Sequence, residues 1–388
     1  MASSLRNIAI LTGTRAEFGI WTPILHALQK SKNLRPQLIV TGMHLQPQFG
    51  YTIRDVEASG IPIEAVVDMY RPDDPPAASL GHAVTRLGAE LAVLKPDLLL
   101  LLGDRLEMLA AANAALVSHI PIAHLHGGET APGTWDEQIR HAITKLAHRH
   151  FPATNRAAQR IQQMGEDPKT IHVIGAPALD TLAAFLTSSP CHPVTLSNPS
   201  ALLLLHPSSP DDALEQKRTS LLLRALRAAN IPFTAIGPNN DPGHTGILRA
   251  YTAAKIPLTM SLSQPDFWQL LTQASLLIGN SSAGIIEAAS FALPVINLGD
   301  RQKGRERNPN ILDVPWSRTA GVSPASLRPI QSAIRFALTN KPFRKKIAQR
   351  KNLYGDGHAA SRLLKILERL PLPLPTTKSF HDLPQGNP

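Results

Sequence analysis

The sequence predicts an α/β protein of two domains, each built on a parallel sheet wound with helices on both faces. Three observations lead to this fold class. Short apolar runs that suit buried strands alternate with helical patterns along most of the chain. The chain has 388 residues, which is more than one core usually holds. Many of the apolar runs end in glycine and polar residues, as do strands at the edge where parallel sheets bind ligands.

Composition excludes several classes of protein. Hydrophobic residues make up 43% of the chain, which is normal for a globular protein, and no apolar run is long enough to span a membrane. The single cysteine, Cys191, excludes an internal disulfide, and the N-terminus lacks a signal-peptide pattern, so we expect a cytoplasmic protein. The net charge of +10 is scattered rather than gathered in a stripe, so neither nucleic acid nor a membrane is expected as a partner.

The first domain is expected over residues 1–186. Its expected strands, each followed by a turn or a helix, are 8–11, 38–40, 63–67, 98–102, 121–125, 150–154 and 171–175. The first strand leads through a turn that contains Arg15, a weak signal for phosphate binding because the full glycine motif is missing. His44 follows the second strand, where a lone histidine is more often structural than catalytic.

The stretch Asp97–Lys145 organises this domain. The unbroken apolar run 98–102 ends at Asp104, and the next short strand is followed by Glu129. Since ligands lie beyond the carboxyl ends of parallel strands, we expect both carboxylates at that edge, on neighbouring strands if the topology is regular.

A well-capped helix is expected after Glu129. Thr134 can cap its N-terminus, and Glu137 three residues later completes a capping box. Asp136 lies in the first turn, where the helix dipole stabilises a carboxylate, and Arg140 one turn later can pair with it. The alternative, that Asp136 and Arg140 only stabilise the helix, stays open on these local features.

The second half repeats the alternation after a Ser- and Pro-rich linker at 187–199. A second domain is expected over residues 200–355, with strands at 201–205, 233–236, 256–260, 275–278 and 295–298. Helices at 327–339, 342–351 and 359–370 close the chain. The Pro-rich tail, 371–388, is expected to be disordered.

The segment Gly279–Gly284 is the sharpest local signal of the second half. Ser281 and Ser282 bring two hydroxyls and free backbone N–H groups to a helix N-terminus after a strand, which predicts an anion site. Arg301 from the next charged loop can close over the same charge, and Glu287 lies where a ribose could donate to it. Alternatively, the serines are only caps and Glu287 is a surface charge.

At this point the sequence resembles a known family, the hydrolysing UDP-N-acetylglucosamine 2-epimerases of sialic-acid and legionaminic-acid synthesis. The matching segments, which span nearly the whole chain in order, are TGTRAEFG, TGMHL, LGDRLE, HLHGGETAPGTWDEQIRHAITKLAH, HP at 206–207, GPNND, IGNSSAGIIEAASFALPVINLGDRQKGRER and YGDGHAASRLLKIL. The resemblance implies two Rossmann-like domains facing a cleft, as in GT-B glycosyltransferases, with the last helix, 356–370, crossing back to the first domain. It also implies a homodimer or homotetramer. No metal is expected, because the histidines near the expected site are not spaced like a zinc site, and no cofactor is expected, because the implied reaction moves no hydride.

The resemblance implies roles for individual residues. Asp104, Glu129 and Asp136 match the acidic residues held to be catalytic, while Arg15 and Arg105 match residues near the diphosphate and the sugar. The matching substrate-binding positions of the second domain are His206, Asn239, Ser281, Ser282, Glu287 and Arg301. His44 is included among the substrate-binding candidates because it lies near the expected site.

The expected activity is conversion of UDP-N-acetylglucosamine to N-acetylmannosamine and UDP, by elimination to a glycal and rehydration. Alternatives are the same reaction on UDP-2,4-diacetamido-2,4,6-trideoxyglucose, a GT-B glycosyltransferase, a non-hydrolysing epimerase and a nucleotide-sugar sensor. The chain departs from the family pattern at HPSSPDD, 206–212, and at Pro132, which puts the sugar's substituents in doubt more than the reaction.

Overall fold

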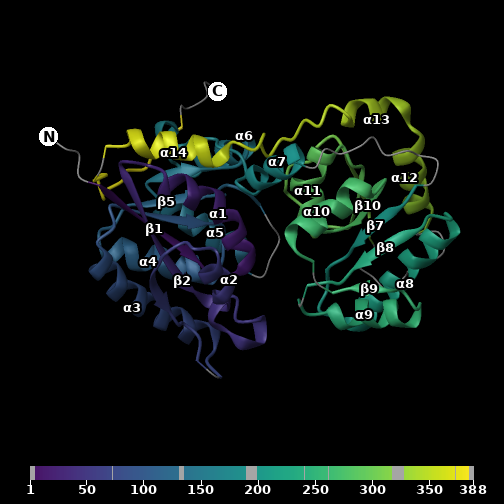
Figure 1. The fold of residues 1–388 in the computed structure, drawn as a ribbon, viewed down its shortest axis with the longest axis horizontal. Helices are drawn as coiled ribbons and strands as arrows, with labels where there is room; N and C mark the ends of the chain where they lie inside the picture. Colours follow the sequence, from purple (N-terminus) through teal and green to yellow (C-terminus); the bar gives the residue numbers. More distant parts are fainter. Residues whose placement is uncertain are drawn as a thin grey trace. The chain divides into compact units, whose positions relative to one another are not determined.

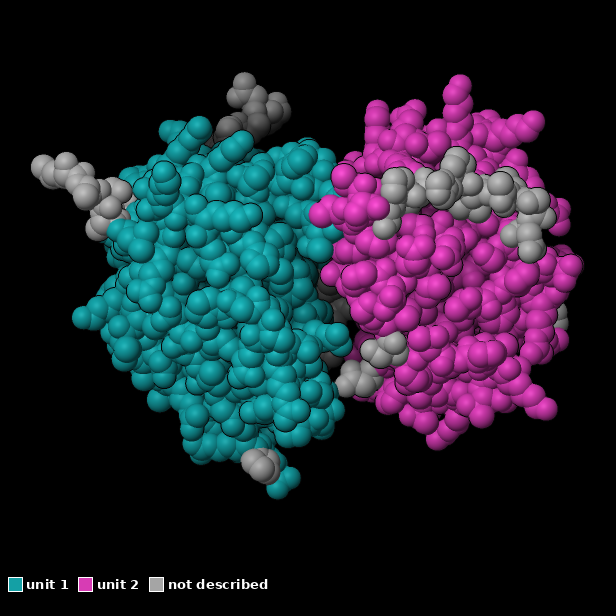
Figure 2. Space-filling model, viewed as in Figure 1, with its two compact units in different colours: residues 1–183, 354–388 teal, residues 184–353 magenta. Residues whose placement is uncertain are grey.

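The computed structural model describes residues 5–71, 73–130, 135–188, 199–239, 241–260, 262–316, 327–371 and 373–383. The chain divides into two compact units (Figure 2). Unit 1 comprises Met1–Ala183 and Tyr354–Pro388, and unit 2 comprises Ala184–Leu353. Among the described residues, no helix is both long enough and apolar enough to cross a membrane.

Unit 1 is built on a six-stranded sheet in the order β3-β2-β1-β4-β5-β6. All its strand pairs are parallel. The strands are β1 (Arg6–Thr12), β2 (Leu34–Thr41), β3 (Ile63–Val67), β4 (Leu98–Leu102), β5 (Ile122–Leu125) and β6 (Arg149–Phe151). The helices are α1 (Arg15–Gln29), α2 (Ile53–Ala58), α3 (Pro76–Leu94), α4 (Leu106–Val117), α5 (Asp136–Leu146), α6 (Asn155–Gln163), α7 (Ala178–Ser188, which runs on into unit 2) and α14 (Ala359–Arg369). Short 3₁₀ turns are Gly42–Leu45, Pro47–Phe49 and Pro168–Thr170.

Both faces of this sheet are covered by helices, as an unbroken apolar strand requires. Side chains alternate along β1: Ile8 and Ile10 pack in a core with α1 and α14, whereas Ala9 and Leu11 pack in a second core with α3 and α4. Figure 1 shows α14, in yellow, lying over the sheet beside α1. The parallel, doubly covered sheet confirms the predicted fold class for this unit.

Unit 2 repeats the architecture with a second six-stranded sheet, in the order β12-β11-β10-β7-β8-β9. Its strands are β7 (Ala201–Leu204), β8 (Phe233–Ile236), β9 (Leu258–Thr259), β10 (Leu276–Gly279), β11 (Val295–Leu298) and β12 (Ile311–Val314). Its helices are α8 (Asp212–Ala228), α9 (His244–Ala253), α10 (Gln264–Gln273), α11 (Ser282–Ile286), α12 (Leu327–Thr339) and α13 (Lys341–Ile347), with a 3₁₀ turn at Ala288–Phe291.

Two strand assignments differ from the sequence-based expectation. The segment 171–175 forms only an isolated bridge from Ile171 to His150, although the amides of His172 and Ile174 donate to the carbonyls of His150 and Pro152. Pro152 has no N–H to donate in return, so a regular ladder does not form. Conversely, β12 was not expected. Its four residues carry Asp313 and lie at the edge of the sheet beside β11, where only one neighbour pairs with them.

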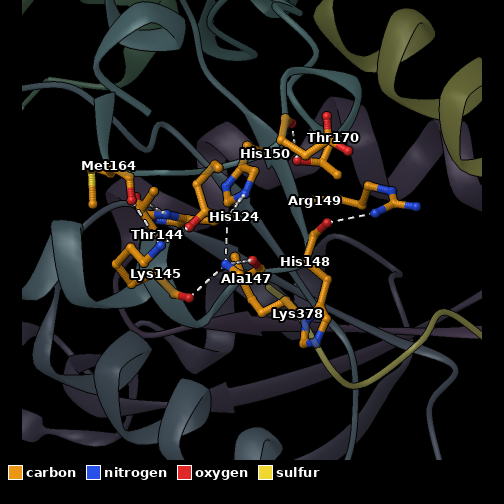
Figure 3. A network of polar contacts seen from close by, with 12 residues as sticks. His124, Thr144, Lys145, Ala147, His148, Arg149, His150, Met164, Thr170 and Lys378 are labelled. Carbon is orange, nitrogen blue, oxygen red and sulfur yellow. Dashed lines mark hydrogen bonds and ion pairs between the residues drawn. The ribbon is translucent and has the colours of Figure 1, made fainter. Parts of the chain in front are cut away.

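The C-terminal tail was expected to be disordered, and the described part of it, 373–383, instead packs on unit 1. Leu374 is buried in the core with α1 and α14. The Lys378 ammonium lies 2.6 Å from the carboxylate of Glu166 and donates to the backbone carbonyls of Lys145 and Ala147 at the end of α5. Figure 3 shows Lys378 with Lys145 and Ala147. A composition rich in proline predicts a lack of helix or strand, but not a lack of specific contacts.

Further contacts hold the same segment. His148 donates from Nε2 to the carbonyl of Thr376 at 3.1 Å, and the His381 amide donates to the carbonyl of Gly165 at 2.9 Å. Burial alone would raise the pKa of Glu166, yet hydrogen bonds from His150, Lys145 and Lys378 lower it to about 2. The tail therefore completes a buried ion-pair network at the C-terminus of α5.

Candidate active site

Two of the three predicted acids lie together at the C-terminal edge of the unit 1 sheet. Strands β4 and β5 are neighbours, with Leu102 opposite Leu125, so the loops after them share one edge. Asp104 follows β4 and Glu129 follows β5. The Arg140 guanidinium, on α5, is ion-paired with Asp104 and lies 3.5 Å from Oε2 of Glu129. One cation therefore joins the two carboxylates.

The Arg140 side chain was expected to pair with Asp136, one turn earlier on the same helix. The structure instead directs it to the two strand-end acids. Its side chain is 5% exposed and that of Glu129 is 8% exposed, so the ion pair has little contact with water. A charge that is shielded from water costs free energy unless an opposite charge pairs with it. The two carboxylates therefore need the guanidinium of Arg140 between them.

A buried histidine aligns the loop that carries Asp104. His124, on β5, donates from Nε2 to the carbonyl of Gly103 at 2.8 Å, and its Nδ1 lies 3.1 Å from the Thr144 hydroxyl on α5. Burial lowers the pKa of His124 to about 3, so its ring is neutral at pH 7. Gly103 has a φ of 75°, a backbone conformation that residues with a side chain rarely adopt, and the chain turns there into Asp104.

The other predicted acid, Asp136, is the first residue of α5. The residue before it, Trp135, occupies the N-cap position without a side-chain capping bond, and the predicted cap Thr134 lies outside the described residues. Asp136 lines a pocket of unit 1 together with Arg105 and Glu107.

Glu129 has a second contact besides Arg140. Nδ1 of His126 lies 2.7 Å from Oε1 of Glu129.

A second carboxylate pair, which the sequence did not predict, lies in the first turns of the helices that follow β1 and β4. Glu17 of α1 and Glu107 of α4 are both buried, and Arg105 contacts them at 3.8 and 3.2 Å. Burial, reinforced by the charge of Glu107, raises the pKa of Glu17 to about 8, and the Gly13 amide donates to its Oε2 at 2.8 Å. The only sequence signal was an acid in the first turn of each helix after a strand.

Arg15 and His44 lie in different surroundings. Arg15, on the first turn of α1, forms an exposed ion pair with Asp55 at 3.2 Å. His44 is fully buried, and both of its ring nitrogens contact threonine hydroxyls, Nε2 that of Thr12 at 3.1 Å and Nδ1 that of Thr52 at 2.8 Å. Burial lowers its pKa. His44 therefore joins β1 to the loop after β2, and its contact with a substrate stays a prediction.

In unit 2, a network of hydrogen bonds lies at the end of β10, and Asn280 makes several of these bonds. This side chain is buried: its Oδ1 accepts from the His206 amide at 2.8 Å, and its Nδ2 donates to the His206 carbonyl at 2.8 Å and to Ser208 at 3.0 Å. Its backbone carbonyl accepts from Gln302 at 3.0 Å. Asn280 was part of the predicted anion segment but was given no role of its own. Its side-chain contacts with His206 join residues that are 74 positions apart in sequence.

The other predicted residues of this edge surround Asn280. The Asn239 amide donates to Nδ1 of His206 at 3.1 Å, and Asp241 accepts from the side chain of Asn239 and lies 3.4 Å from Arg301. Burial, together with the charge of Arg301, lowers the pKa of His206 to about 4. The structure therefore brings His206, Asn239 and Arg301 to one edge of the sheet.

The predicted serines begin α11 at the same edge. Ser281 is the N-cap and accepts from the Ala283 amide at 3.4 Å, and Ser282 is the first helical residue. The chain enters this turn through Gly279, whose φ is 149° and where a Cβ would lie 1.8 Å from the carbonyl of Leu204. Glycine is required there because the backbones of β7 and β10 approach so closely.

Glu287, predicted to receive a ribose, already has a partner. Its Oε2 accepts from the Trp268 indole at 2.5 Å, and burial raises its pKa to about 7. Since a carboxylate has two oxygens and several lone pairs, this bond leaves acceptor capacity for a ligand hydroxyl.

Each unit thus presents polar side chains beyond the carboxyl ends of parallel strands, which is where open α/β sheets bind nucleotides and their derivatives. Unit 2 offers hydroxyls, backbone N–H groups and an arginine, the chemistry of a phosphate site, whereas unit 1 offers carboxylates for proton transfer. These features define a protein of two Rossmann-like units, each with polar side chains at the ligand-binding edge of its sheet.

Comparison with known proteins identifies the family. Residues 26–368 match the family described as UDP-N-acetylglucosamine 2-epimerase, and the chain belongs to this family of enzymes. It is 37% identical to a UDP-N,N'-diacetylbacillosamine 2-epimerase (hydrolyzing) of Legionella pneumophila over 95% of this chain and 97% of the relative. It is 34% identical to a UDP-N-acetylglucosamine 2-epimerase of Neisseria meningitidis over 80% of this chain and 84% of the relative.

A solved structure shares the fold. The crystal structure of UDP-GlcNAc 2-epimerase from Neisseria meningitidis bound to UDP-GlcNAc aligns with a TM-score of 0.78 at 17% identity, over 94% of this chain and 100% of that one. This likeness confirms the predicted fold class of two Rossmann-like domains.

Proposed function

We propose that this chain is a hydrolysing 2-epimerase that acts on UDP-2,4-diacetamido-2,4,6-trideoxyglucose and releases UDP and the free sugar with carbon 2 inverted. The observation that carries the proposal is the pairing of Asp104 and Glu129 on the guanidinium of Arg140. The two carboxylates share this cation but differ in exposure, which is 22% for the Asp104 side chain and 8% for that of Glu129. Proton transfer on two faces of one carbon requires acids whose surroundings differ. The Legionella relative supports this choice of substrate, because UDP-N,N'-diacetylbacillosamine, for which it is named, is another name for this UDP-sugar.

The reaction begins with an elimination. A carboxylate of unit 1 takes the proton from carbon 2 while the bond from carbon 1 to the UDP oxygen breaks. The electron pair of the carbon–hydrogen bond becomes the double bond of a glycal, and UDP leaves with the electrons of the broken bond. A proton on carbon 2 is weakly acidic, so this step needs stabilisation of the leaving diphosphate at the same moment.

Unit 2 would supply that stabilisation. The proposed hydrogen-bond donors to the diphosphate are the hydroxyls of Ser281 and Ser282, the backbone N–H groups at the N-terminus of α11, and the guanidinium of Arg301. His206, held neutral by burial at pH 7, would act as a hydrogen-bonding group rather than as a cation. Glu287 would accept from the ribose.

The second half of the reaction is a hydration. Water adds its oxygen to carbon 1 of the glycal and gives up one proton to a carboxylate, while an acid returns a proton to carbon 2 from the face opposite to the one that lost it. Two faces require two acid–base groups, and Asp104, Glu129 and Asp136 are the proposed set. The hydrated product is the free sugar of inverted configuration at carbon 2.

UDP-N-acetylglucosamine is the second candidate substrate, which the Neisseria relative favours. Offering both UDP-sugars to the full chain and measuring UDP release decides between them. We expect release from both at rates that differ, with the diacetamido sugar faster. Release only when an acceptor sugar is added would instead identify a glycosyltransferase.

The isosteric variants Asp104→Asn, Glu129→Gln and Asp136→Asn test the acids. Each keeps the shape of the side chain and removes its charge. We expect turnover to be lost in each while UDP binding, measured by calorimetry, is kept. A variant that turns over at the rate of the parent removes that residue from the mechanism.

A further inference from the structure

The excess of positive charge in this chain lies almost entirely in one stretch of unit 2. Residues 314–353 hold nine basic residues and no acidic ones, whereas the other 348 residues of the chain hold 30 basic and 29 acidic residues. The basic residues are scattered along the sequence, but their excess over the acidic ones is not, which corrects the expectation of a scattered net charge. A region of one sign attracts ions of the opposite sign across the surrounding solvent.

The helices α12 and α13 carry most of these basic residues and lie against each other (Figure 1). The rings of Phe336 on α12 and Phe343 on α13 have their centroids 5.3 Å apart. The opposite face of α12 packs in the core of unit 2 through Ile330, Ile334 and Ala337. Because the apolar face of α12 is turned inward, the charged side chains of the two helices are directed to solvent over the same part of unit 2.

The exposed basic residues of this stretch form what we term the α12–α13 basic surface. Its members are Arg328, Arg335, Lys341, Lys345, Lys346 and Lys351. Within the described ranges of the chain, none of the six forms an ion pair. Phe336, next to Arg335, is 42% exposed. Cations without a counter-charge and a half-exposed apolar ring therefore lie close together.

The chemistry of this surface favours a membrane with anionic headgroups over a nucleic acid. Four of the six cations are lysines, whose flexible point charges suit a diffuse layer of headgroups, whereas arginine is preferred where phosphates are bound in a fixed, forked geometry. Single-stranded nucleic acids also stack their bases on open aromatic faces, but the Phe336 ring already packs against Phe343. An exposed apolar ring among cations is typical of proteins that lie on a membrane.

We propose that the α12–α13 basic surface attaches unit 2 to the surface of a membrane that contains anionic lipids. The lysine and arginine side chains contact the lipid phosphates, and Phe336 lies at the level of the headgroups. None of the six basic residues belongs to the proposed diphosphate site at the end of β10. The inference therefore goes beyond the proposed epimerase function and does not depend on it.

Co-sedimentation of the full chain with lipid vesicles tests the proposal. One set of vesicles consists of phosphatidylcholine with about 30% phosphatidylglycerol, and the other of phosphatidylcholine alone, both in about 0.1 M salt. We expect the chain to sediment with the anionic vesicles only. Raising the salt to about 0.5 M should release it, because salt screens the attraction between exposed charges.

Charge reversal tests whether this surface is responsible. One variant combines Arg335→Glu, Lys341→Glu, Lys345→Glu and Lys346→Glu. Each basic residue near an anionic surface strengthens binding by about fivefold, so we expect affinity for the anionic vesicles to fall by about 100-fold or more. The matched control reverses four exposed charges of unit 1, with glutamate in place of Arg86, Arg156, Lys169 and Lys365, and should lose much less affinity.

Circular dichroism and UDP release from the UDP-sugar verify that both variants are folded and active. If charge reversal on α12 and α13 does not yield a folded chain, the milder pair Lys345→Gln and Lys346→Gln decides, with an expected loss of about tenfold.

Three results would overturn the proposal. Equal loss of vesicle binding in the variant and the control would show that only the net charge matters. Equal sedimentation with neutral vesicles would show that anionic headgroups are not recognised. Binding to a DNA duplex without binding to anionic vesicles would assign the surface to nucleic acid. UDP release is measured separately, so none of these results bears on the epimerase function.

Discussion

Arg140, in the second turn of α5, is ion-paired with Asp104 at the end of β4, although the two residues are 36 positions apart in sequence. The same guanidinium reaches Glu129, which follows β5. A helix, two strands and two loops are thereby joined through one buried cation. Two of the three acids that are proposed to move protons, Asp104 and Glu129, are thus held by Arg140.

Replacing this cation should stop turnover. In Arg140→Met, two largely buried carboxylates lose their counter-charge, so we expect kcat to fall by about 100-fold or more and stability to fall by about 3–5 kcal/mol. Arg140→Lys restores the charge but not the forked geometry and should recover only part of the rate. Steady-state kinetics and urea unfolding measure both effects. A kcat within twofold of the parent's in Arg140→Met would show that the pairing is not needed for turnover.

Asn280 should control nucleotide binding through the loops that it joins. Asn280→Ala removes three side-chain hydrogen bonds to His206 and Ser208. We expect UDP affinity to fall about tenfold, because each lost buried bond costs about 1 kcal/mol and part of this loss also weakens the free protein. Calorimetry measures the affinity, and Gln269→Ala, at an exposed position of α10, is the control. Unchanged affinity would limit Asn280 to a structural role.

Lys378 should stabilise unit 1 through Glu166. The pKa of Glu166 is about 2, below its ordinary value of 4.5, so its stabilising contribution is complete above pH 4.5 and is lost as pH falls toward 2. Lys378→Met should lower the free energy of unfolding by about 1–3 kcal/mol at pH 6, and the difference should shrink below pH 4.5. Lys365→Met, an exposed position of α14, is the control. Equal stability of parent and variant at pH 6 would contradict the packing of the tail.

Glu17 should impose the opposite pH dependence. Its pKa in the folded chain is about 8, above the ordinary 4.5, so the folded state binds more protons and stability is lost as pH rises from 4.5 through about 8. Glu17→Gln removes this loss. Between pH 4.5 and 8.5 we expect the parent to lose a few kcal/mol relative to the variant, whereas Glu57→Gln, at an exposed position, follows the parent. Parallel pH profiles of parent and Glu17→Gln would show that Glu17 is already charged at pH 4.5.

The sequence predicted the strand-end positions of Asp104 and Glu129 because a buried parallel strand has a readable apolar pattern and a defined edge. It did not predict the partner of Arg140, since helix spacing rules consider only neighbours on the same helix. The sequence did not predict the pairing of Glu17 with Glu107 for a related reason. The two residues are 90 positions apart, and only the order of the strands in the sheet brings them together. The packing of residues 373–383 on unit 1 was not predicted either. A proline-rich composition indicates a lack of helix and strand, but it does not indicate that Lys378 pairs with Glu166.

The most direct measurement is the turnover of the diacetamido UDP-sugar by the full chain in deuterium oxide, followed by NMR of the products. If elimination and rehydration occur, the free sugar carries deuterium at carbon 2 with inverted configuration, and one UDP is released for each sugar. A product that keeps protium at carbon 2, or one that is still attached to UDP, would contradict the account.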